Sequence, residues 1–91
     1  MNSLDDVYDQ MRLFQRALLE FNEEIRTSAQ ALAKSHDDLC GLWRDQAALH
    51  YRQLYEPLAD SLHQYLQGDA PRFERFMENK VRQLERYLNG A

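Results

Sequence analysis

The chain has 91 residues, of which 44% are hydrophobic and 29% charged, and its formal net charge is −4. This composition excludes a disordered chain, and the length predicts one small domain that buries only about 60–65% of its unfolded surface. Basic residues are too few and too evenly offset by acidic ones for a phosphate-binding surface, so we expect no nucleic-acid partner.

An apolar seam with alternating three- and four-residue spacing runs through the first half of the chain. Its members are Leu4, Val7, Met11, Phe14, Leu18, Phe21, Ile25, Ser28, Leu32, Ser35, Leu39 and Leu42. A period of about 3.5 residues over several heptads predicts one long helix that packs along another helix. We place this helix at about residues 4–41, with Ser3 as its N-cap and Gly41 as its left-handed closing residue.

Small and apolar side chains also flank the seam, for example Ala17, Ala29 and Ala33. A two-stranded coiled coil needs only a narrow stripe, whereas a bundle needs a wider one. The wide stripe favours at least three helices around the core. We expect the chain's later helices to cover much of the seam, and the stretch from Leu4 to Phe21 to need a partner where they do not.

A second helix is predicted at about residues 45–67, with Asp45 as its N-cap. Pro57 lies inside it, and an interior proline either ends a helix or kinks it. The apolar face keeps its phase across the proline, from Tyr51 and Leu54 to Leu58 and Leu62. We therefore prefer a kink at Pro57 to a break.

The segment Gly68-Asp69-Ala70-Pro71 combines a C-cap glycine, a capping aspartate and a proline suited to a first helical turn, which predicts a turn. A third helix follows at about residues 71–88. The expected fold is all-α, a long antiparallel helical hairpin with a third C-terminal helix. Residues 1–91 then form a single elongated helical domain.

The sequence has no recognisable catalytic motif, and we expect no enzymatic activity, no cofactor and no small-molecule substrate. His36 and Cys40 lie four residues apart, a spacing that can supply two zinc ligands, with His50 as a third. Such pairs arise often by chance in helices. We therefore prefer a boundary histidine and a small buried thiol to a metal site.

The start of the chain is acidic and amphipathic, which predicts neither a cleavable signal peptide nor a membrane span. Cys40 is the single cysteine, so an internal disulfide is excluded and a reducing compartment is compatible. We expect a cytoplasmic protein, or one exported by a route that needs no cleavable signal.

The only tryptophan, Trp43, lies at the predicted turn near mid-chain, and alanines and spaced tyrosines follow it. In this arrangement residues 4–67 resemble the WXG family, small helical hairpins named for a Trp-x-Gly turn and exported by type VII secretion. The resemblance implies pairing into four-helix homodimers or heterodimers. It makes Trp43 the turn tryptophan and places Asp45 at the family's glycine position. Tyr65 and Asp69 correspond to the family's Tyr-x-x-x-Asp/Glu export signal.

These observations favour a small helical protein–protein interaction module, a dimer-forming WXG-like component or substrate of a bacterial secretion or toxin system. The alternative is a monomeric immunity, antitoxin or adaptor protein that binds its partner through an acidic, tyrosine-rich surface. Strong salt dependence of partner binding would favour this alternative over an apolar dimer interface. The predicted interface consists of Leu4, Val7, Met11, Phe14, Leu18, Phe21, Trp43, Tyr51 and Tyr55.

Overall fold

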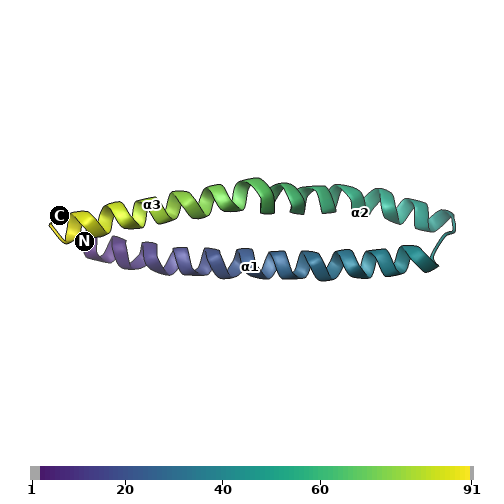
Figure 1. Cartoon of the computed structure of the whole chain (residues 1–91), viewed down its shortest axis with the longest axis horizontal. Helices are drawn as coiled ribbons and strands as arrows, with labels where there is room; N and C mark the ends of the chain where they lie inside the picture. Colours follow the sequence, from purple (N-terminus) through teal and green to yellow (C-terminus); the bar gives the residue numbers. More distant parts are fainter. Residues whose placement is uncertain (1–2, 91) are drawn as a thin grey trace.

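Two antiparallel helical arms run side by side along the whole length of the computed structural model, which describes residues 3–90 (Figure 1). The first arm is α1 (Leu4–Leu42). The second joins α2 (Gln46–Gln64), the π-helical turn η1 (Tyr65–Asp69) and α3 (Ala70–Leu88). The molecule measures 65 × 22 × 17 Å. It is therefore an elongated all-α hairpin.

The helix starts agree with the sequence. Ser3 caps α1 through a reciprocal pair, in which the Asp6 N–H donates to Ser3 Oγ (3.1 Å) and the Ser3 N–H donates to the Asp6 carboxylate (3.3 Å). Asp45 caps α2 by accepting the Ala48 N–H at 3.0 Å. Both predicted N-caps are confirmed.

Helix α1 ends close to the predicted position, but its closing residue differs from the prediction. Gly41 lies inside the helix and does not adopt the left-handed conformation. The helix ends one residue later, and Trp43 follows in extended backbone while its N–H still bonds the Leu39 carbonyl (2.8 Å). The extended residue leads the chain directly into the Asp45 cap, so no left-handed residue is needed to reverse its direction.

The predicted turn at residues 68–71 and the separate third helix are both wrong. The chain continues from α2 into α3 through η1, where the Ala70 N–H bonds the Tyr65 carbonyl five residues back. Pro71 has no N–H, and in a regular α-helix its ring would clash with the carbonyl four residues earlier. A single wider π turn moves those carbonyls and lets the helix pass the proline. The fold is thus a two-arm hairpin.

Helix α2 also continues through its interior proline. It runs without a break from Gln46 to Gln64, with Pro57 inside. The apolar positions before and after the proline stay in phase, as expected for one continuous helix. The predicted break alternative is therefore wrong, while the kink stays a prediction.

The arms meet through a face of α1 that is rotated from the predicted seam. Every seventh residue from Tyr8 to His36, namely Tyr8, Gln15, Asn22, Ala29 and His36, is buried or half-buried, together with Met11, Leu18 and Ile25. The second arm contributes Ala48, Ala70, Met77 and Val81 to the core. Each of two packed helices buries only a narrow stripe. One line of the predicted seam, which contains Val7, Phe14 and Phe21, therefore remains exposed to solvent.

Candidate interaction surface

The line left outside consists of large apolar side chains on one side of the hairpin. Val7, Phe14 and Phe21 of α1 are 38%, 47% and 52% exposed. The Phe14 ring lies 5.8 Å from the Phe73 ring of α3, and the Phe21 ring 6.5 Å from the Tyr65 ring, centroid to centroid. These contacts place both arms' aromatic side chains on the same side. We call this side the apolar face.

Helical spacing extends the apolar face towards the turn. Leu32 and Leu39 follow Phe21 by whole helical turns along α1, and Leu54 and Leu58 precede Tyr65 in the same way along α2. All four leucines are exposed. The apolar face comprises Leu4, Val7, Phe14, Phe21, Leu32, Leu39, Leu54, Leu58, Phe73 and Tyr87.

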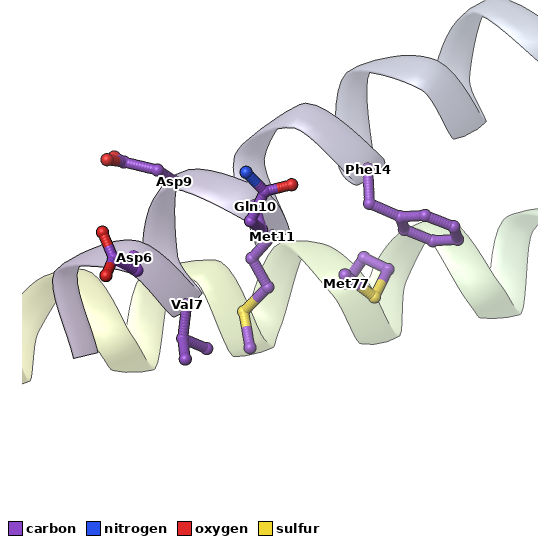
Figure 2. Close-up of a pocket in the computed structure, with 7 residues that line it drawn as sticks. All are labelled: Asp6, Val7, Asp9, Gln10, Met11, Phe14 and Met77. Carbon is purple, nitrogen blue, oxygen red and sulfur yellow. The ribbon is translucent and has the colours of Figure 1, made fainter. Parts of the chain in front are cut away.

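Two shallow grooves mark the end of this face near the helix termini. The first is lined by Val7, Met11, Phe14 and Met77, and Figure 2 shows Val7 and Met11 projecting towards α3 while Phe14 lies beside Met77. Leu4, Leu84 and Tyr87 help to line the second. Asp6 and Asp9 are turned away from the apolar side chains in the same view. Both grooves are thus open and mainly apolar, and the first is edged by Asp6 and Asp9 whereas the second is edged by Lys80.

Charge is scarce on the α1 part of the apolar face. Most residues between its large side chains are small or uncharged, namely Gln10, Ala17, Ser28 and Ser35, and the exception is Glu24 beside Ser28. Depletion of charged residues is the compositional signal of an interface core. A long exposed apolar surface of this kind is typical of interaction surfaces.

Polar groups gather elsewhere on the hairpin. Near the helix termini the Tyr8 hydroxyl donates to Glu85 (2.9 Å), and Arg12 donates to the Tyr8 hydroxyl (3.0 Å). Towards the middle, Arg26 and His63 line a groove with the small residues Ala29 and Ala59. The two sides of the hairpin therefore differ in polarity, and the apolar face is the candidate interaction surface.

An aromatic cluster closes the turn end of the hairpin. His36 stacks on Tyr55, with ring centroids 3.7 Å apart and ring planes 10° apart. Its Nδ1 lies 2.8 Å from the Tyr51 hydroxyl, and the Tyr51 ring lies 5.5 Å from the ring of Trp43. Trp43, Tyr51 and Tyr55, all predicted interface residues, are half-buried here. Their rings hold the two arms together at this end.

Cys40 lies beside the same cluster, with its Sγ 3.6 Å from His36 Nε2. The pair is adjacent, as the four-residue spacing predicts. Within residues 3–90, however, no three His, Cys, Asp or Glu side chains are grouped to hold a metal ion. The ligand set of His36, Cys40 and His50 is therefore not assembled.

Tyr51 gives the cluster an expected pH dependence. Burial, reinforced by the nearby Cys40 and Tyr55, raises the pKa of Tyr51 above its usual value of 10.0. The unfolded chain then ionises Tyr51 at lower pH than the folded chain, so stability present below pH 10.0 falls as pH rises through the raised pKa. Urea midpoints at about pH 8 and about pH 11 should differ less for Tyr51→Phe than for the unmodified chain. Equal differences would contradict this.

A buried polar triad joins the arms at mid-hairpin. Asn22 is 1% exposed, its Nδ2 donates to Glu74 Oε2 (2.8 Å), and its Oδ1 accepts the Tyr65 hydroxyl proton. Sequence analysis missed Asn22 because it lies outside the predicted seam. The available signal was the seven-residue repeat of mainly polar residues from Tyr8 to His36. The triad fixes the register of the arms, because a shift would leave buried groups unpaired.

Asn22→Ala should lower the free energy of unfolding by about 1–3 kcal/mol, because Tyr65 and Glu74 both lose a buried partner. Chemical denaturation monitored by circular dichroism measures the change. Tyr65→Phe is the matched variant, since it removes one of the two hydrogen bonds and keeps the ring, and it should cost less. A larger loss for Tyr65→Phe would show that the triad is not centred on Asn22.

The other predicted site residues are distributed between the core and the surface. Leu18 is buried between the arms and Met11 is half-buried, whereas Leu4, Val7, Phe14 and Phe21 belong to the apolar face. The two residues of the predicted export motif lie in η1. Tyr65 is half-buried in the triad, and Asp69 is exposed. The motif stays a prediction.

Comparisons with known protein families, curated proteins and solved structures give no match to this chain. Over the described residues, the helices lack the combination of length and hydropathy that crossing a bilayer requires. The main feature of the candidate interaction surface is the apolar face.

Proposed function

We propose that this protein is a small, non-enzymatic helical interaction module that works as a dimer, as a homodimer or with another helical protein. The observation that carries the proposal is the apolar face, which extends over both arms. Helical hairpins of this shape bury such a face by packing against two further helices to form a four-helix bundle.

The finer proposal is a WXG-like component or substrate of a bacterial secretion or toxin system. It is supported by the hairpin itself, by Trp43 at the turn and by the position of Tyr65 and Asp69 in the second arm. Asp45 at the family's glycine position acts as the N-cap of α2, which gives this residue a local role of its own.

The alternative, a monomeric immunity, antitoxin or adaptor protein with an acidic, tyrosine-rich binding surface, has weaker support. Two of the tyrosines on which it depends, Tyr51 and Tyr55, are engaged with His36 between the arms. A ligand reaching them would have to compete with these contacts.

Sedimentation equilibrium from about 1 to about 100 µM, with unfolding midpoints measured at both ends of this range, tests the proposal. A dimer should become more stable at higher protein concentration, because folding and association are linked. A monomer whose midpoint is independent of concentration, and which binds no protein encoded beside it, would contradict the proposal.

A further inference from the structure

We propose that the apolar face binds a second copy of this chain turned end for end, so that the two α1 helices pack antiparallel across a two-fold axis between Glu24 and Ile25. This inference rests on the proposed function and adds the identity of the partner and its register.

The dimensions of the face suit such a partner. Figure 1 views the hairpin down its shortest axis, so each broad side is about 65 Å long and 22 Å wide. Stable protein interfaces bury roughly 800 Å² on each partner, and a broad side of these dimensions can supply that area. A second hairpin has the same length and covers the whole face, whereas a short peptide would leave much of it in water.

Side-chain sizes along α1 select the antiparallel orientation. One line of α1 residues at seven-residue spacing begins with three large members of the apolar face, Val7, Phe14 and Phe21. It continues with two small residues, Ser28 and Ser35. Reversing the helix about the point between Glu24 and Ile25 brings Phe21 opposite Ser28 of the second copy. The same operation brings Phe14 opposite Ser35 of that copy. Both pairs recur by symmetry, since a two-fold interface is self-complementary.

The last residue of this line fits the same register. Leu42, 89% exposed at the end of α1, comes opposite Val7, beside the groove lined by Val7, Met11 and Phe14. A parallel arrangement of the two α1 helices would instead set Phe14 and Phe21 against themselves and leave the serines facing each other. A large side chain opposite a small one packs without voids or overlap, so the antiparallel register is favoured.

Exchange of the two sizes tests the register. Phe14→Ser leaves two symmetric gaps in the dimer, and Ser35→Phe introduces two symmetric overlaps. Each single variant should raise the dimer Kd by about tenfold or more. The double variant Phe14→Ser/Ser35→Phe restores large against small at both contacts and should return the Kd close to that of the unmodified chain. An equimolar mixture of the two single variants should also dimerise, because each then supplies what the other lacks.

The mismatched double variant Phe14→Ser/Ser28→Phe is the control, since residues 14 and 28 do not face each other in this register. It should remain as weak as the single variants, and circular dichroism should show full helix content throughout. A dimer that the matched exchange fails to restore, or that the mismatched one restores equally, overturns the register and leaves the proposed function standing. A monomer at every concentration overturns the second copy as partner and also removes the homodimer from the proposed function.

Discussion

Replacing Leu18 by alanine should lower the free energy of unfolding by about 2–5 kcal/mol, the largest loss expected from a single core substitution in this chain. Leu18 is 8% exposed and lies between the arms. Removal of a large buried apolar side chain costs its transfer free energy and also leaves a cavity. A thin two-arm core has few other side chains to compensate, and urea denaturation followed by circular dichroism measures the loss.

Leu13→Ala is the matched control for Leu18. Leu13 belongs to the same helix and has the same chemistry, but it is 54% exposed. Its replacement should change the free energy of unfolding by no more than about 0.5 kcal/mol. Equal losses for the two variants would show that α1 does not pack on the second arm through the face described above.

The second large effect concerns association. Phe21→Glu places a carboxylate in the middle of the apolar face, where a partner would have to bury it without a counter-charge. We expect the Kd of the proposed dimer to rise by about 100-fold or more while the hairpin stays folded. Sedimentation equilibrium measures the association, and circular dichroism measures helix content.

Leu19→Glu provides the comparison for this variant. Leu19 is 46% exposed and two residues from Phe21, so it points away from the apolar face. The new carboxylate should therefore leave the Kd nearly unchanged. If Leu19→Glu dissociated the dimer as strongly as Phe21→Glu, the interface would not be the apolar face.

The C-terminal half of the chain shows where local reasoning was insufficient. Gly68 and Pro71 are both turn residues by propensity, and together they predict a turn. In the structure one π turn lets the helix continue past Gly68 and Pro71. The burial of Met77 and Val81 against α1 stabilises this continuous arm more than a turn at residues 68–71 would. No residue composition identifies a π turn in a sequence, because the π turn is a local response to tertiary packing.

The candidate site was predicted in part for a related reason. The spacing identified Val7, Phe14 and Phe21 as one apolar line and Met11, Leu18 and Ile25 as its neighbour, and it treated the two as one seam. In the structure the second line packs between the arms, and the first is left exposed. Which line turns inward depends on what the opposite arm presents.

The sequence by itself determined the elements that are local. Its periodicity and its capping residues Ser3 and Asp45 specify the long helix and the start of the next, because these signals act over a few residues of one segment. Only the tertiary structure decided that there are two arms and which stripe is buried. Asn22 paired with Tyr65 and Glu74 sets the rotation and register of the arms, since a buried polar group is stable only where its partners meet it. That rotation leaves the apolar face on the surface.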